Sequence, residues 1–112
     1  MNRIELPASE LIAEFIKVRL KASLPDDALP LGRRALLDPL AGAIAASNEE
    51  ATNIAIRYAR STTGNALGTI WTAGERTTIE MAALANGVAA HVLDYDDVTS
   101  PMRGHPSVVL FP

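Results

Sequence analysis

A chain of 112 residues has room for one small domain or for a piece of a larger one. Its 13 acidic and 10 basic residues give a formal charge of −3, which argues against a nucleic-acid-binding surface because such surfaces need clustered lysine and arginine. The absence of cysteine excludes disulfides, thiolate nucleophiles and iron–sulfur ligation within this stretch. Apolar residues make up 48% of the chain but aromatic residues only 4%, so we expect closely packed, alanine-rich helices.

Neither a membrane span nor a signal peptide is visible. The longest weakly polar run, residues 81–93, contains Asn86, Gly87 and His91 and is shorter than the ~20 apolar residues of a spanning helix. Residues 1–7 lack the apolar stretch of a signal peptide. We therefore expect a soluble cytoplasmic protein that binds neither membrane nor nucleic acid.

The first two predicted elements are helices. Apolar residues at helical spacing predict an amphipathic helix over residues 8–21, with Pro25 after its end. A second helix is predicted over residues 27–46, and Pro39 is expected either to kink it or to divide it in two. The small side chains of residues 40–46 favour close packing on a neighbouring element.

A capping box predicts the start of the third helix. Ser47 precedes Glu50 by three residues, so each side chain can satisfy a backbone N–H of the other. This helix is expected to run to Arg60 with Ile54 and Tyr58 facing the core. A short extended stretch over residues 66–72 and a turn at Gly74 follow.

A second capping box, Thr77 and Glu80, predicts a fourth helix that runs to Leu93. Small and apolar residues cover most of its circumference, which is typical of a helix buried on all sides. The apolar run over residues 108–111 at the end of the chain differs from a frayed, polar terminus. Both features lead us to expect the N-terminal fragment of a longer protein.

The end of the fourth helix carries the most informative residues. Asp94, Asp96 and Asp97 follow His91 where the helix dipole leaves partial negative charge, and each acid costs about 0.3–1 kcal/mol there. Local rules broken in this way often mark functional sites. His91 and Asp94 are three residues apart and are expected to share a helix face, whereas Asp96 is interpreted as a solvated residue or a helix-end cap. His105 returns just before the next helix, which is expected to begin at Pro106 or Ser107.

Structural interpretations of these residues stay open beside the functional ones. His91 fits a hydrogen-bonded core histidine, and Asp94 and Asp97 suit a structural role as well as a chemical one. His91, Asp94, Asp97 and His105 also offer the nitrogen and carboxylate ligands that zinc, iron or manganese accept, although their spacing matches no strong metal motif. The sequence contains no phosphate-binding glycine loop, no Gly-x-Ser-x-Gly elbow and no Walker lysine.

Four short pieces of this region form one pattern: Ala85-Asn86-Gly87, Ala90-His91, Leu93-Asp94-Tyr95-Asp96-Asp97 and Gly104-His105-Pro106-Ser107. The pattern resembles the signature of the MmgE/PrpD family, which includes 2-methylcitrate dehydratase and cis-aconitate decarboxylase. The resemblance implies a mainly α fold, with residues 1–112 forming the N-terminal part of a large helical domain that is followed by a smaller α+β domain. It also implies a homodimer and cofactor-free reactions of small polycarboxylic acids.

Site roles follow from the resemblance. Asp94 and His105 match active-site residues of the family and are predicted to be the catalytic pair, without metal or cofactor. The family often has threonine directly after the second of the paired aspartates, whereas this chain has Val98 there and Thr99 one residue later. The side chains predicted to bind substrate are Asp97, Thr99, Arg103 and His91.

The leading hypothesis is a hydro-lyase similar to 2-methylcitrate dehydratase. A polycarboxylate needs cations, preferably arginine, and only Arg103 lies near the motif, so the isolated fragment is expected to be inactive. Two alternatives remain: a non-catalytic helical interaction module whose alanine-rich helices bury against a partner, and a metal-dependent hydrolase that uses the His/Asp residues. The sequence does not distinguish dehydration, decarboxylation and epimerisation, and it does not identify the substrate.

Overall fold

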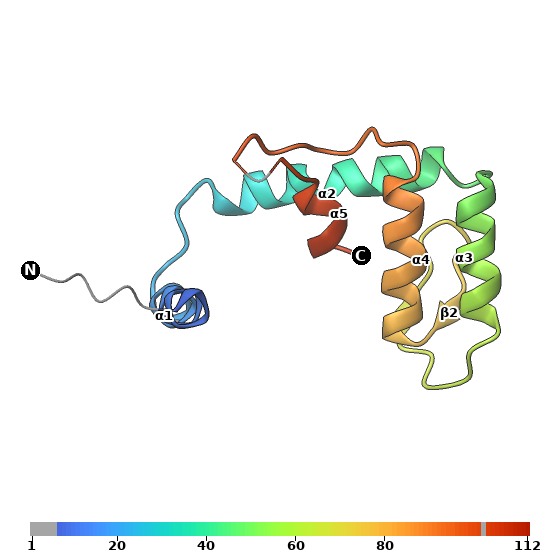
Figure 1. Cartoon of the computed structure of the whole chain (residues 1–112), viewed down its shortest axis with the longest axis horizontal. Helices are drawn as coiled ribbons and strands as arrows, with labels where there is room; N and C mark the ends of the chain where they lie inside the picture. Colours follow the sequence, from blue (N-terminus) through green and yellow to red (C-terminus); the bar gives the residue numbers. More distant parts are fainter. Residues whose placement is uncertain (1–6, 102) are drawn as a thin grey trace, which may run out of the picture. The chain divides into compact units, whose positions relative to one another are not determined.

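A computed structural model describes residues 7–101 and 103–112. These residues form a mainly helical domain with five helices and one two-stranded hairpin (Figure 1). None of the described helices has the length and apolar character that crossing a membrane requires. The elements, in chain order, are α1 (Ala8–Lys21), α2 (Ala28–Ala45), α3 (Glu50–Arg60), β1 (Gly68–Thr69), β2 (Arg76–Thr77), α4 (Ile79–His91) and α5 (Pro106–Leu110).

The chain divides into two compact units, residues 1–30 and 31–112, which we describe separately. The first unit contains α1, whose predicted boundaries are confirmed. None of the residues of α1 is buried, and Phe15 is 60% exposed. The Arg19 guanidinium lies 5.3 Å from the centre of the Phe15 ring, a cation–π contact on the helix surface. The apolar stripe of α1 is therefore left open to solvent.

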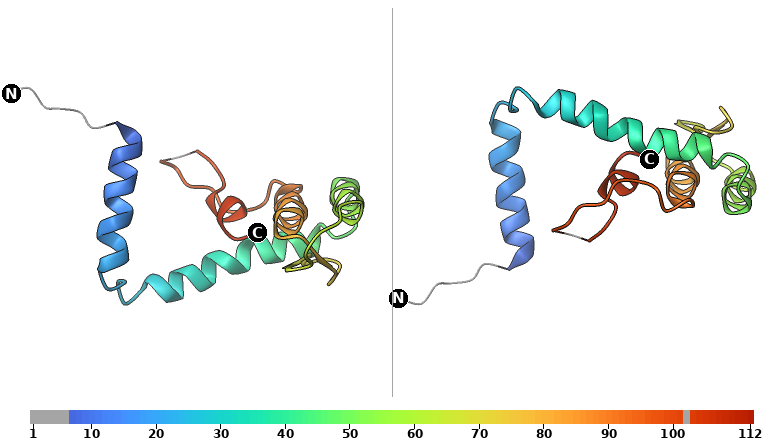
Figure 2. Two further views of the ribbon diagram at one scale, coloured as in Figure 1. Left: turned by 90° about the horizontal axis from the view of Figure 1, so that it is seen from below. Right: turned by 90° about the horizontal axis from the view of Figure 1, so that it is seen from above.

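In the second unit, α2 continues as one helix through Pro39, so division into two helices is excluded. Proline cannot donate the helical hydrogen bond, but the fully buried Pro39 ring gains apolar contact that offsets part of this loss. The predicted close packing of small residues is confirmed at Gly42, where a Cβ would lie 2.7 Å from the Ala90 carbonyl oxygen. Ala43 and Ala90 are buried at this contact, with Val108 of α5 packed beside them. Both views of Figure 2 show the C-terminal part of α2 passing beside α4.

Helices α3 and α4 lie side by side and enclose the main core (Figure 1). The expectation that Ile54 and Tyr58 face inward is wrong, because they are 50% and 57% exposed. Small residues let the two helices approach closely, and Ile56 of α3 is buried between them while Ile54 and Tyr58 remain outside. The buried residues of the core are Ala55, Ile56, Ala59, Ile70 and Ala85.

The predicted capping box at Ser47 is also wrong. Ser47 lies in the turn that leaves α2, where its N–H donates to the carbonyl of Ile44. Glu49 occupies the N-cap of α3 and makes no side-chain capping hydrogen bond. The turn after α2 therefore extends over residues 46–48, and the first N–H groups of α3 lie beyond the reach of the Ser47 side chain.

The hairpin packs against α4 through one buried amide. Strands β1 and β2 pair antiparallel, and Gly74 adopts a φ of +66° in the turn between them, where the sequence predicted a turn. Asn86 of α4 accepts a hydrogen bond from the Trp71 N–H at 2.9 Å and donates to the Thr69 carbonyl at 3.0 Å. Asn86 thus satisfies backbone groups of the hairpin and fixes it on the helix.

Helix α4 differs from its prediction at both ends. Thr78, one residue later than predicted, is the N-cap, and its hydroxyl accepts from the Met81 N–H at 3.4 Å. The Glu80 N–H and the Thr78 hydroxyl hold the pKa of the Glu80 carboxyl below its ordinary value. The helix ends at His91, and its burial is one-sided, because Ile79 is 60% exposed.

Candidate functional site

The motif forms a loop that leaves α4 and returns to it. Beyond His91 the Asp94 N–H donates to the His91 carbonyl at 2.8 Å, and Asp94 adopts a φ of +50°. An isolated β-bridge then joins Thr99 to Gly104, with the Thr99 N–H donating to the Gly104 carbonyl at 3.0 Å. This bridge closes the loop and brings His105, the N-cap residue of α5, back beside His91.

Asp96 is the centre of the resulting cluster. It is only 6% exposed, so the interpretation of Asp96 as a solvated residue is wrong. One carboxylate oxygen lies 2.9 Å from His91 Nδ1, and the other lies 3.1 Å from His105 Nδ1. The two imidazole rings meet edge to face with their centres 4.7 Å apart. A buried carboxylate therefore connects the two histidines of the chain.

The two contacts of Asp96 differ in alignment. The contact with His91 is a hydrogen bond, whereas the contact with His105 has hydrogen-bond length without hydrogen-bond angles. His105 Nδ1 and Asp96 Oδ2 are both buried and have no other hydrogen-bond partner among the described residues. Because a buried polar atom without a partner costs free energy, a small rotation that aligns this contact is favourable.

Asp94 occupies the open side of the cluster. Its side chain is 80% exposed, and its Oδ1 lies 3.5 Å from His105 Nε2, longer than an ordinary hydrogen bond. The sequence predicted that Asp94 and His91 share a helix face. This prediction is wrong, because α4 ends at His91. The loop instead brings Asp94 to His105, so the predicted pair is together by a different route.

Asp97 has its carboxylate engaged elsewhere. Its two oxygens accept from the Ser107 N–H at 3.1 Å and from the Ser107 hydroxyl at 2.7 Å. Its own N–H donates to the Asp38 carboxylate at 2.9 Å, which ties the loop to α2. These contacts make Asp97 a cap of α5, and its predicted contact with substrate stays a prediction.

Thr99 and Arg103 lie on the loop itself. The Arg103 N–H donates to the Thr99 carbonyl at 2.8 Å, and Arg103 has a φ of +49° and an exposed side chain. The Thr99 hydroxyl is buried without a hydrogen-bond partner among the described residues. The roles predicted for both residues in binding substrate stay predictions.

The chain is similar to known proteins over most of its length. Residues 10–112 match the MmgE/PrpD N-terminal domain. The chain belongs to the MmgE/PrpD family. It is 32% identical over 90 residues to cis-aconitate decarboxylase from Homo sapiens, and the alignment covers 80% of this chain but 18% of that enzyme. No solved structure matches the chain. The family includes lyase-type enzymes that decarboxylate or dehydrate small carboxylic acids.

The cluster of this MmgE/PrpD domain also has the composition of a metal site. His91, Asp94, Asp96 and His105 offer ligand atoms that all lie within 4.8 Å of one another. Nitrogen and carboxylate donors suit zinc, iron or manganese. Asp96 stands in place of the Asp97 that the sequence hypothesis included. The Nδ1 atoms of both histidines already face the Asp96 carboxylate, so a metal ion would have to compete with these contacts.

Cavities adjoin the cluster on the MmgE/PrpD domain. Asp96 lines a cavity of about 210 Å³ together with Asp38, Gly42 and Tyr95. His91 lines a second cavity of about 370 Å³, whose walls include Val88 and Val108. The Asp96 side chain is fully shielded from solvent, so the first cavity adjoins the residue without reaching its carboxylate. The second cavity gives a small ligand space beside His91.

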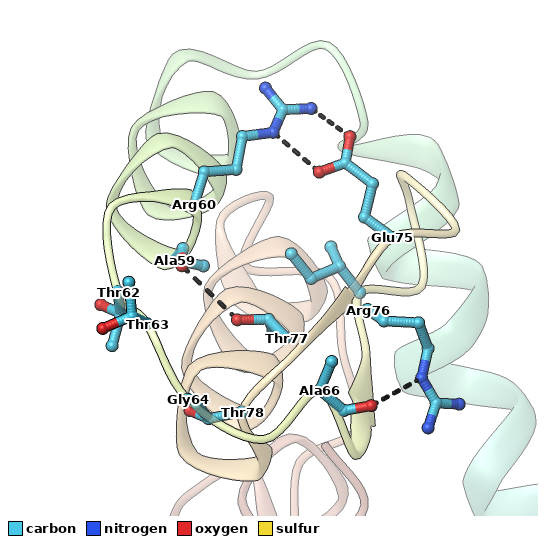
Figure 3. A pocket seen from close by; sticks show the side chains of 11 residues that line it. Ala59, Arg60, Thr62, Thr63, Gly64, Ala66, Glu75, Arg76, Thr77 and Thr78 are labelled. Carbon is cyan, nitrogen blue, oxygen red and sulfur yellow. Dashed lines mark hydrogen bonds and ion pairs between the residues drawn. The ribbon is translucent and has the colours of Figure 1, made fainter.

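A further pocket of about 370 Å³ lies at the hairpin of the MmgE/PrpD domain (Figure 3). Its arginines are already occupied, because Arg60 pairs bidentately with Glu75 and Arg76 donates to the Ala66 carbonyl at 3.1 Å. The Arg60 hydrogen bond lowers the pKa of Glu75, and the pair raises the pKa of Arg60. No histidine lines this pocket.

Sequence reasoning missed Asp96, the most buried acid of the motif. A usable signal was present, because the two histidines of the chain flank the acidic run and a buried imidazole needs a hydrogen-bond partner. Spacing alone could not select the correct aspartate. The residues after His91 leave the helix, so helical periodicity no longer predicts which side chains face each other.

Proposed function

We propose that this domain contributes an acid–base pair, His105 with Asp94, to a lyase of small polycarboxylic acids. The single observation that carries the proposal is the position of Asp94 Oδ1, 3.5 Å from Nε2 of a His105 ring whose other nitrogen faces buried Asp96. Family membership and the similarity to cis-aconitate decarboxylase support the substrate class. The reaction we favour is dehydration, as in 2-methylcitrate dehydratase.

Dehydration of a hydroxy acid needs two proton transfers. A base takes a proton from the carbon next to a carboxylate, the C–H electron pair forms the double bond, and the hydroxyl leaves as water after an acid protonates it. His105 Nε2 and Asp94 lie near enough to act on neighbouring atoms of one substrate. Their separation exceeds a hydrogen bond, which is common before substrate binds. The pair thus has the two groups that this elimination requires.

Substrate binding requires positive charge that the cluster lacks. Asp94 and Asp96 repel a polycarboxylate, and Arg103 is the one cation that the motif loop supplies in its described part. We propose that Arg103, Thr99 and His91 contact the substrate and that Asp97 acts by holding α5. We also propose that further lysine or arginine side chains supply the remaining positive charge and that the protein acts as a homodimer.

The test uses the protein encoded by the complete open reading frame that contains these 112 codons, and it measures substrate turnover. His105→Ala and Asp94→Asn are each expected to lower kcat/KM by about 10²–10⁴, the usual contribution of a general acid or base. The far-UV circular dichroism should stay unchanged. Asp27→Asn, an exposed position with the same change of charge, serves as the control. Near-normal turnover in both variants would refute the assigned roles.

A panel of three substrates separates the reaction types. Incubation with 2-methylcitrate, citrate and cis-aconitate, followed by product analysis, distinguishes loss of water from loss of carbon dioxide. We expect loss of water from 2-methylcitrate. Release of carbon dioxide from cis-aconitate would instead assign decarboxylation and leave the acid–base pair in place.

The ligand geometry of the cluster favours one second candidate, a metal-dependent hydrolase. His91, Asp94, Asp96 and His105 are close enough to share one ion. Treatment of the purified protein with a chelator, followed by metal analysis and assay, tests this function. Loss of activity that one divalent metal restores would support it, and unchanged activity after metal removal would dismiss it.

A further inference from the structure

We propose that Asp96 is a positioning residue that holds both His91 and His105 in the Nδ1–H tautomer. In this arrangement Nε2 of His105 is the basic atom of its ring and faces Asp94. The purpose of this arrangement rests on the proposed acid–base function, but the arrangement itself is testable without any substrate.

The contacts of Asp96 divide evenly between the two rings. One oxygen faces His91 Nδ1 at 2.9 Å and the other faces His105 Nδ1 at 3.1 Å. The Asp96 side chain is completely shielded from solvent, so water does not compete for either oxygen. His105 Nδ1 has no other partner among the described residues. Both rings therefore depend on the same carboxylate.

A carboxylate sets the tautomer because it accepts hydrogen bonds and does not donate them. His91 Nδ1, which is hydrogen-bonded to Asp96, must then carry a proton, and so must His105 Nδ1 once a small rotation of the ring aligns its 3.1 Å contact. The lone pair of each neutral ring is left on Nε2. The distance from His105 to Asp94 agrees with this assignment. Asp94 is also an acceptor, and it lies 3.5 Å from His105 Nε2 instead of at hydrogen-bond distance.

The assignment has a consequence for proton transfer. When His105 Nε2 takes a proton from a substrate, the ring becomes a donor on both nitrogens. Asp96 then accepts at Nδ1, and Asp94 is already placed to accept at Nε2. His91 contacts the His105 ring edge to face and limits its rotation. Asp96 thus orients the base, and Asp94 accepts the hydrogen bond of the protonated Nε2 on the solvent side until this proton passes to the leaving hydroxyl, which departs as water.

The test is ¹⁵N NMR of the imidazole nitrogens at a pH where the rings are neutral. The chain has two histidines, so the spectrum contains two spin systems and assignment needs one histidine variant. We expect the Nδ1–H tautomer for both rings, the minor form of free histidine. A wild-type His105 in the Nε2–H form would overturn the proposal and would leave the lyase assay to decide the function separately.

Asp96→Asn sharpens the test. The amide offers one acceptor oxygen and one donor nitrogen, so it can accept from one Nδ1–H but must donate to the other Nδ1. We therefore expect one of the two rings to change to the Nε2–H tautomer. Asp27→Asn, which makes the same chemical change at an exposed position, should leave both rings as in the wild type.

Two results, one from Asp96→Asn and one from its control, would contradict the proposal. A folded Asp96→Asn protein with both rings still in the Nδ1–H form would show that another group sets the tautomer. A change of tautomer in Asp27→Asn would show that the signal reports general loss of charge. If Asp96→Asn does not fold, the wild-type spectrum alone decides, since the tautomer of His105 is read there directly.

Discussion

The hairpin pocket and the His/Asp cluster each hold a carboxylate beside nitrogen-bearing side chains, yet they differ in burial. Arg60 and Glu75 form a bidentate pair whose side chains are 53% and 42% exposed. The Asp96 side chain is fully shielded and faces two imidazoles. Exposed ion pairs contribute little to stability, whereas a buried carboxylate must find partners for its oxygens. Burial, and not the number of hydrogen bonds, therefore distinguishes the functional candidate.

Backbone conformation separates the two regions in the same way. The hairpin turns at Gly74, where a positive φ is unstrained. The motif loop places Asp94 and Arg103 at positive φ, and no other non-glycine residue described in the structure does so. Such conformations cost free energy and gather at functional sites. The loop of the cluster thus holds strain that the hairpin avoids.

The largest expected effect is on the core beneath the hairpin. Ile70 is 1% exposed, and Ile70→Ala is expected to lower the free energy of unfolding by about 2–5 kcal/mol through lost burial and a cavity. Leu67→Ala, in the same segment but at a position 64% exposed, is the control and should change stability far less. Urea denaturation followed by circular dichroism measures both. Equal losses would mean that the hairpin is not anchored through Ile70.

An intermediate effect is expected in the cluster region. Asp97→Ala removes the acceptor of two Ser107 hydrogen bonds and should cost about 1–2 kcal/mol, as for the loss of a helix cap. Asp97→Asn retains one acceptor oxygen and should recover part of this loss. Unfolding in urea compares the three proteins. An Asp97→Ala protein as stable as the wild type would show that α5 is held by its apolar contacts instead.

The smallest effect is expected at the exposed ion pair. Because the Arg60 hydrogen bond lowers the folded-state pKa of Glu75, the pair stabilises the fold above the ordinary glutamate pKa. This contribution is lost as the pH falls through the lowered folded-state value. Glu75→Gln should therefore differ from the wild type only slightly at neutral pH and not at all in acid or at molar salt.

Melting curves across pH and salt concentration measure this difference for Glu75→Gln. A large loss of stability that persists in molar salt would contradict the comparison between exposed and buried carboxylates. It would place the hairpin pair among the groups that determine the fold.

The sequence predicted elements that depend on local order. The bounds of α1, the end of α3 at Arg60 and the start of α5 at Pro106 follow from apolar periodicity and proline placement. The predictions were less accurate where contacts with a neighbouring element determine the local structure. Thr78 instead of Thr77 caps α4, because the Thr77 hydroxyl donates to the Ala59 carbonyl of α3.

By itself the sequence determined a mainly helical chain and a family motif with two histidines around three aspartates. Only the tertiary structure decided which aspartate lies between the histidines. The reason is that α4 ends at His91, and the path beyond it is fixed by contacts between distant residues, from Asp97 to Asp38 and from Thr99 to Gly104. Helical periodicity encodes neighbours within a helix, and it carries no information about a loop that other elements hold in place.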